Sequence, residues 1–473
     1  MESHLSFNEK KRALYVLLFF LFVFSLLIVQ FYKIQILEGK KWQEIAHRQH
    51  HIKVVDSARR GVFYSNTSIK KGHPEIKTPF VVDIPKFHLF ADPQALERAN
   101  HEEIAYAIGN RLKLNAEEKA KIVKELGKKS RSRKLCAWLS PHAKEEIEKW
   151  WYSYAKKHSL AKNALFFPKD YKRSYPYGRL LGQVLHTLRE ERDPISQQPI
   201  PTGGLELSLN EYLKGKEGRR WVLKSPRQPL DTATLVIPPE DGADVYLSVN
   251  HTLQAIVEEE LLKAVLNAKA KCGWAILMEP KTGEIWAFAQ APTFDLSSAR
   301  SYFNNPLMQE HTKIKALTDP FEPGSVMKPL TVIIAMEANE ELKKRGERPL
   351  FYPEEKIATG SGNFPGRSKP ITELHTYKYL NMDMAIQKSS NIYVGRLAQR
   401  IVERLGDKWY RQKLEELFGF GHKTGIELKG ESGGWLPTIG KKYKNGALEW
   451  SKPTPFSIAM GYNVRSEERR VGK

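Results

Sequence analysis

Cysteine is scarce in this sequence, with two residues among 473, Cys136 and Cys272. They lie far apart, form no metal or redox spacing and could make at most one disulfide, so we expect two unpaired thiols. No His-Glu-x-x-His motif and no Cys/His cluster indicates zinc. The chain is nevertheless long enough for two or three domains with apolar cores, given 41% hydrophobic and 27% charged residues.

Long apolar runs are also missing, with one exception near the N-terminus. Residues 13–32 hold 20 residues without a charge, about the length that spans a ~30 Å hydrocarbon core as a helix. Lys10, Lys11 and Arg12 precede the run, which predicts a cytoplasmic tail at residues 1–12. No small-residue cleavage site follows, so we favour an uncleaved signal anchor over a removed signal peptide. Everything after about residue 33 should then lie outside the cytoplasm.

The net charge of +21 raises the possibility of a nucleic-acid partner. The strongest basic run, Gly127–Lys134, has no stacking aromatic residues within it, and no helix-turn-helix or RNA-binding signature accompanies it. We therefore expect a solvated basic face, one that could lie against an anionic membrane surface. The predicted anchor also argues against nucleic acid as the partner.

The rest of the chain divides into two regions. Residues 33–243 are polar with short β-like runs, and they contain two helical periods in His101–Leu126 and a helix with a Ser-Pro start in Leu139–His158. A second organisation starts near residue 244, with a strand, a helix capped by Thr252, and a hairpin over Cys272–Asp295. This order predicts an α+β chain in which a sheet carries helices on its faces.

Residues 319–329, DPFEPGSVMKP, place a serine at the start of a mostly apolar helix. The free N–H groups there favour a developing negative charge at Ser325. Lys328 lies at i+3, on the same face one turn along. A lysine in an apolar setting has a lowered pKa and can act as a base for the serine. Gly324 allows close backbone approach.

The segment EPGSVMKP resembles the active-site serine segment of the penicillin-binding transpeptidases. Five further stretches resemble class B members in the same order along the chain: Ala58–Asn66, Tyr171–His186, Gly203–Arg220, Glu279–Asp295 and Phe418–Pro437. The resemblance implies a single transmembrane helix, an α+β pedestal (dimerisation-type) domain at 33–243, and a transpeptidase domain of penicillin-binding and β-lactamase-like fold at 244–464. In Ala58–Asn66, Tyr64-Ser65 replaces the usual Asp-Arg.

The family's second motif, Ser-x-Asn, is carried over to Ser389 and Asn391, because among five such triplets only this one has the family's flanking residues. The resemblance implies that the Ser389 hydroxyl relays a proton near the leaving group. It implies that the Asn391 amide orients Lys328 and the substrate. The alternative is that Ser389 is a helix-cap or loop serine.

The third motif, Lys-Thr/Ser-Gly on a strand, is not assigned. Lys281-Thr282-Gly283 precedes Ser325 and forms the predicted hairpin turn, and Lys423-Thr424-Gly425 corresponds to a non-catalytic turn of the family. After Val464, residues 465–473 (RSEERRVGK) show no apolar pattern and resemble no part of the family. We interpret them as a non-native tail and expect the transpeptidase domain to be C-terminally incomplete.

The implied function is a DD-transpeptidase of the bacterial inner membrane, single-pass, with an extracytoplasmic catalytic domain. Ser325 would attack the D-Ala-D-Ala carbonyl of a stem peptide from a lipid-linked precursor, and β-lactams would acylate it as mimics. The serine N–H would be one oxyanion donor. No metal or organic cofactor is expected. A membrane glycan polymerase and division or elongation proteins are the implied partners.

Two alternatives stay open. A serine β-lactamase or DD-carboxypeptidase would hydrolyse the acyl-enzyme, although the anchor and the long pedestal region argue against that class. A non-catalytic scaffold that activates the polymerase would need no third motif.

Overall fold

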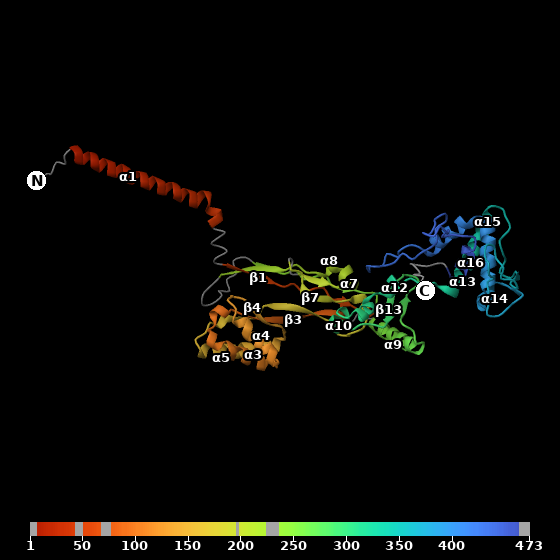
Figure 1. Ribbon diagram of the computed structural model, residues 1–473, viewed down its shortest axis with the longest axis horizontal. Coiled ribbons are helices and arrows are strands. Elements are labelled where there is room, and N and C mark those ends of the chain that lie inside the picture. Colours follow the sequence, from red (N-terminus) through yellow and green to blue (C-terminus); the bar gives the residue numbers. More distant parts are fainter. Residues whose placement is uncertain (1–6, 43–50, 68–76, 195–197, 224–235, 463–473) are drawn as a thin grey trace. The chain divides into compact units, whose positions relative to one another are not determined.

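The computed structural model describes residues 7–42, 51–67, 77–194, 198–223 and 236–462 (Figure 1). The tail predicted at 465–473 and the first six residues lie outside this range. The described chain forms two compact units. The first comprises residues 1–64, 79–176 and 211–246, and the second comprises 65–78, 177–210 and 247–473. The second unit thus includes residues 177–210, which the sequence analysis assigned to the pedestal region; the predicted domain bounds stay a prediction.

The N-terminal apolar run forms a helix, α1 (Phe7–Tyr32), which continues into a short π-helical turn, η1 (Lys33–Leu37). Residues 14–37 form the one helix of the described chain that is long and apolar enough to cross a membrane. Its side chains are almost all exposed within the protein, as a helix surrounded by lipid requires. The helix therefore coincides with the predicted anchor.

Two sheets build the first unit. In the smaller one, β9 (Gly218–Leu223) pairs antiparallel with β1 (His51–Asp56) and β10 (Val236–Ile237). The larger one is organised around the long strand β3 (Pro79–Ala91). Its antiparallel partners are β2 (Phe63–Tyr64), β4 (Arg133–Leu139), β5 (Leu165–Phe166) and β6 (Lys169–Ser174), and β11 (Val245–Tyr246) joins β2 in parallel.

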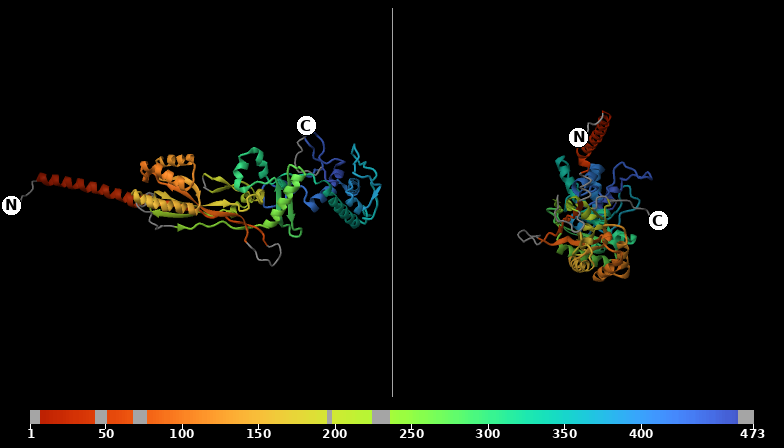
Figure 2. Two further views of the ribbon diagram at one scale, coloured as in Figure 1. Left: turned by 90° about the horizontal axis from the view of Figure 1, so that it is seen from below. Right: turned by 90° about the vertical axis from the view of Figure 1, so that its left-hand side faces the viewer.

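Three helices pack against the larger sheet: α3 (His101–Arg111), α4 (Ala116–Leu126) and α5 (Pro141–Lys157). Figure 2 shows them, orange to yellow, gathered beside the strands of this unit. Their buried faces share one apolar core with β3, including Leu89, Ile104 and Trp151. The two predicted helical periods are confirmed as α3 and α4, and Asn115 caps α4 in a reciprocal pair with Glu118. The predicted Ser-Pro start of α5 is also confirmed.

The second unit begins with a helix and a hairpin. Helix α9 (His251–Asn267) packs on β13 (Ile285–Ala291), which pairs antiparallel with β12 (Gly273–Met278). The predicted hairpin is thus confirmed. The predicted cap at Thr252 is wrong. Asn250 caps α9, since its side chain accepts the N–H groups of Thr252 and Leu253. Asparagine precedes the helix by one residue and offers a carbonyl at the position where these N–H groups converge.

The core of the second unit lies between three helices: α13 (Met327–Lys344), α15 (Asn391–Phe418) and α16 (Thr454–Ala459). Figure 1 shows them side by side, and all three contribute fully buried side chains to one cluster. The remaining elements are short: α6 (Gly182–Leu185), β7 (Leu188–Arg192), β8 (Pro199–Pro201), α7 (Gly204–Ser208), α8 (Asn210–Leu213), α10 (Ala299–Phe303), α11 (Pro306–Gln309), α12 (Lys315–Thr318), β14 (Ile357–Ala358), β15 (Tyr379–Leu380) and α14 (Met382–Gln387).

Candidate active site

Ser325 lies in a 3-10 turn, η7 (Gly324–Val326), directly before α13. The sequence predicts Ser325 at the helix start, whereas regular α-helix begins two residues later, at Met327. Gly324 has φ +62°, a left-handed conformation that glycine adopts without strain. Ser325 and Val326 are exposed, whereas Met327 and Lys328 are buried. The turn therefore exposes the serine to solvent at the N-terminal end of α13, whose first two residues are buried.

Lys328 occupies the first turn of α13 and is 2% exposed. Its Nζ donates to the carbonyl oxygen of Ser389 and, at 3.0 Å, to the Ser389 hydroxyl. Burial lowers the pKa of Lys328, while the negative charge of Glu373 acts in the opposite direction. Within the described chain, no hydrogen bond joins Lys328 to Ser325. Catalytic hydrogen bonds often form only when a substrate is bound, and the pairing of Lys328 with Ser325 stays a prediction.

Ser389 and Asn391 flank the start of α15. Ser389 is exposed and has φ +54°, an uncommon conformation for a residue with a side chain. The intervening residue, Ser390, is the N-cap of α15 and accepts the N–H of Tyr393 at 3.1 Å. The cap serine is thus Ser390, and Ser389 is left to bond Lys328.

Asn391 does not bond Lys328 in the described chain. Its side-chain nitrogen donates to the carbonyl oxygen of Thr372 at 3.1 Å. The structure therefore brings Lys328 and Ser389 together, places Ser325 one turn from Lys328, and holds Asn391 beside them at the first residue of α15. The role suggested for Asn391 stays a prediction.

Three residues that sequence reasoning did not single out take part in this arrangement. Ser390 caps α15, Glu373 bonds Ser390, and Gly461 accepts the Gly324 N–H at 3.1 Å through its carbonyl oxygen. Serine before a helical period is a known cap signal, so Ser390 could have been found. Nothing local marks Glu373 or Gly461, because their partners lie far away in the sequence.

The two Lys-Thr-Gly triplets lie where the sequence analysis put them. Gly283, with φ +76°, belongs to the turn between β12 and β13. Thr424 donates to the Glu431 carboxylate through its N–H and its hydroxyl, in a loop after α15. Neither triplet lies on a strand, which is the position that the third motif requires.

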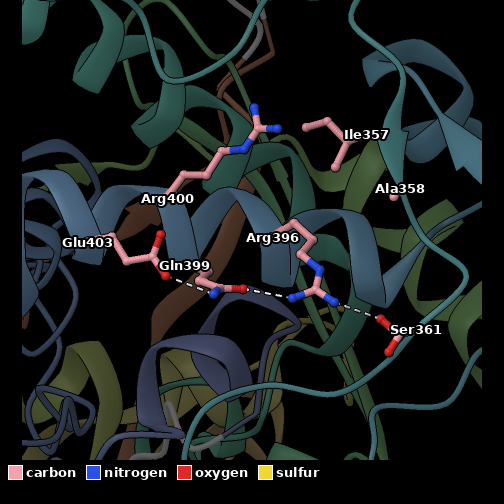
Figure 3. A pocket seen from close by; sticks show the side chains of 7 residues that line it. All are labelled: Ile357, Ala358, Ser361, Arg396, Gln399, Arg400 and Glu403. Atoms are coloured by element: carbon pink, nitrogen blue, oxygen red, sulfur yellow. Dashed lines mark hydrogen bonds between the residues drawn. The ribbon is translucent and has the colours of Figure 1, made fainter.

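A hollow of about 340 Å³ opens beside α15, and none of the four predicted site residues lines it (Figure 3). Its polar side chains bond one another. Arg396 donates to Gln399 and to the carbonyl oxygen of Ser361, and Gln399 donates to Glu403 (Figure 3). Arg400 is paired with Glu355. Because its lining residues bond one another within the described chain and include none of the predicted site residues, we assign the hollow no part in the site.

Comparison with known sequences identifies one region clearly. Residues 273–461 match the family model "Penicillin binding protein transpeptidase domain". A probable peptidoglycan D,D-transpeptidase, PbpC, of Pseudomonas aeruginosa is 31% identical over 297 residues, which cover 63% of this chain and 46% of that protein. The corresponding PenA of Neisseria gonorrhoeae is 30% identical over 334 residues, covering 69% and 49%. The chain spans about half the length of these relatives.

Solved structures show the fold. Penicillin-binding protein 2X of Streptococcus thermophilus matches with a TM-score of 0.63 and 19% identity, over 87% of this chain and 57% of that one. The penicillin-binding protein PBP2 of Helicobacter pylori, solved in complex with MreC, matches with a TM-score of 0.65 and 18% identity, over 88% and 74%. The predicted fold class, an α+β multidomain chain with one N-terminal apolar helix, is confirmed.

Proposed function

This chain carries the transpeptidase domain of a class B penicillin-binding protein, and from that premise we propose that it cross-links peptidoglycan stem peptides through an acyl-enzyme at Ser325. The observation that carries the proposal is a buried lysine bonded to the Ser389 hydroxyl, one helical turn from an exposed serine. Relatives named peptidoglycan D,D-transpeptidases support the reaction class.

Lys328 would start the reaction as a general base. An amine must be neutral to accept a proton, and burial moves the pKa of Lys328 toward that condition. As Lys328 takes the hydroxyl proton, Ser325 Oγ attacks the carbonyl carbon between the two D-Ala residues. The N–H of Ser325 would stabilise the oxyanion, at a helix start that favours negative charge.

Ser389 would pass the proton onward. Its hydroxyl accepts from Lys328 Nζ at 3.0 Å, so it can take a proton from Lys328 and donate its own to the leaving amine. D-Ala then departs and the acyl group stays on Ser325 Oγ. An amine from a neighbouring stem peptide would attack this ester by the reverse sequence and form the cross-link. Asn391, held by Thr372 at the start of α15, would orient the substrate peptide.

The proposal extends to location and partners. Helix α1 would anchor the chain once in the bacterial inner membrane, with the transpeptidase domain outside the cytoplasm. The relative from Helicobacter pylori was solved with MreC, and another match concerns a peptidoglycan synthase complex of polymerisation and cross-linking. We infer that this chain also works beside a membrane glycan polymerase and cell-elongation or division proteins.

Labelling with a fluorescent penicillin tests the proposal. We expect the full-length protein in membranes to form a covalent adduct at Ser325, because a β-lactam presents the same acyl chemistry as D-Ala-D-Ala. Ser325→Ala should abolish the adduct. Lys328→Arg should reduce the labelling rate at least about a hundredfold, because a guanidinium does not deprotonate in proteins.

Three other outcomes of the labelling experiment would contradict the proposed function. Labelling of the Ser325→Ala variant would remove Ser325 from its role. A wild-type adduct that is hydrolysed rapidly, with turnover of penicillin, would point to a β-lactamase. A protein that binds its polymerase partner yet forms no adduct would be a scaffold.

A further inference from the structure

Glu373 lies outside the predicted motifs, and it bonds residues next to Ser389 and Asn391 at the start of α15. Its Oε1 accepts a hydrogen bond from the Ser390 hydroxyl and another, at 2.8 Å, from the N–H of Ile392. Ser390 is the cap of α15, and the residue before it, Ser389, receives the two hydrogen bonds from Lys328. One carboxylate oxygen thus holds the Ser389–Ser390 turn, to which Lys328 donates its hydrogen bonds.

No hydrogen bond within the described chain explains the position of the other carboxylate oxygen of Glu373, Oε2. Oε2 is buried and lacks a hydrogen-bond partner in the described part of the chain. An unsatisfied buried oxygen costs about 1–3 kcal/mol, and more when the group is charged. The helix start beside it offsets part of that cost, since the N-terminus of α15 favours negative charge. A glutamine could make both Oε1 bonds, so the hydrogen bonds alone do not require a carboxylate here.

The charge has a specific neighbour in Lys328. The negative charge of Glu373 favours the protonated form of Lys328, and within the described chain no ion pair joins the two. Burial lowers the pKa of Lys328 and Glu373 raises it, with burial the larger effect. The two effects together set how readily the lysine takes up and gives back a proton.

On the basis of the proposed function, we propose that Glu373 is a positioning residue that holds the Ser389–Ser390 turn against Lys328 and stabilises the ammonium formed when Lys328 takes the Ser325 proton. During acylation by penicillin, the Ser325 Oγ–carbonyl bond forms and the β-lactam C–N bond breaks. The serine proton travels through Lys328 and the Ser389 hydroxyl to that nitrogen. A buried ammonium exists between these steps, and an unpaired buried charge is costly unless a counter-charge lies nearby.

Acylation rates of Glu373→Gln and Glu373→Ala, measured over a range of pH with fluorescent penicillin on the full-length protein, test this role. Glu373→Gln keeps both Oε1 bonds and removes the charge. We expect its acid limb to move to lower pH by about one unit, because Lys328 then loses its proton more easily. Its maximal rate should fall about tenfold, the equivalent of one pKa unit of lost stabilisation. Glu416→Gln, the same change at an exposed site of α15, is the matched control and should leave the profile unchanged.

Glu373→Ala tests the positioning role of Glu373 separately from the effect of its negative charge. It also removes the bonds to Ser390 and Ile392, so we expect a lower melting temperature and a further loss of maximal rate. If Glu373→Gln reproduces the wild-type pH profile and only Glu373→Ala is impaired, Glu373 is merely structural and the proposal is overturned. If the wild-type protein forms no adduct at Ser325, the proposed function itself fails and takes this proposal with it.

Discussion

Gly461 is the residue whose backbone fixes the position of the serine turn. Its carbonyl oxygen accepts the Gly324 N–H, and a Cβ at Gly461 would lie 2.0 Å from the Gly324 oxygen and 2.5 Å from its nitrogen. Its φ is +85°, which also disfavours a side chain. The turn that presents Ser325 therefore depends on close backbone approach by the segment after α16.

We expect Gly461→Ala to lower stability by about 3 kcal/mol or more and to slow penicillin acylation at least about tenfold. Backbone strain at positive φ contributes about 1–2 kcal/mol, and the clash with Gly324 adds to it and displaces Ser325. Thermal unfolding and labelling rates measure the two effects. Gly446→Ala is the matched control, because Gly446 has φ +82° and nothing within 4 Å of a Cβ. Equal behaviour of the two variants would show that strain alone matters.

The start of α9 shows which residue determines where this helix begins. The sequence pattern predicted a cap at Thr252, two residues after Asn250. Asn250 is buried, accepts the first N–H groups of the helix and donates to the carbonyl oxygen of Asn66 at 2.6 Å. Thr252 is exposed, one residue inside the helix. The buried asparagine therefore contributes most to the stability of the helix start.

Asn250→Ala should lower the free energy of unfolding by about 1–2 kcal/mol, the usual range for a lost N-cap. Thr252→Ala should change it by less than about 0.5 kcal/mol, as exposed substitutions generally do. Chemical denaturation of the detergent-solubilised protein compares them directly. A larger loss for Thr252→Ala would restore the boundary that the sequence predicted.

At the scale of the whole molecule, α1 is the candidate membrane anchor. It carries exposed apolar side chains along its length, such as Phe22 and Leu26, which have no partner surface within the first unit. A lipid bilayer would bury them, as the proposed anchor role of α1 requires. Stable attachment to the membrane should therefore depend on this helix and little on the basic surface.

The double variant Phe22→Arg/Leu26→Arg should lose resistance to alkaline extraction from membranes. Each arginine near the centre of a spanning helix costs about 2.5–3.5 kcal/mol for insertion. Tyr152→Arg/Tyr212→Arg adds the same charge at exposed sites of the first unit and should remain in the membrane fraction. Equal retention of both variants would mean that surface charge, and not α1, holds the protein.

Much of the protein follows from its sequence. Four local predictions are confirmed because each depends on neighbours within a few residues: the apolar helix α1, the helical periods of α3 and α4, the Ser-Pro start of α5 and the β12–β13 hairpin. The i+3 spacing of Ser325 and Lys328 is likewise a property of one helical turn.

Tertiary structure alone decided what surrounds those two residues. Lys328 meets Ser389 across 61 residues because α13 and α15 share one core. The same packing brings Gly461 to Gly324, and the chain before α14 brings Glu373 to the cap of α15. Such contacts depend on how helices pack against one another, and local sequence patterns do not predict this packing. The sequence therefore predicted the pair that we propose to react, Ser325 and Lys328, and the packing of α13, α15 and α16 determined which residues surround that pair.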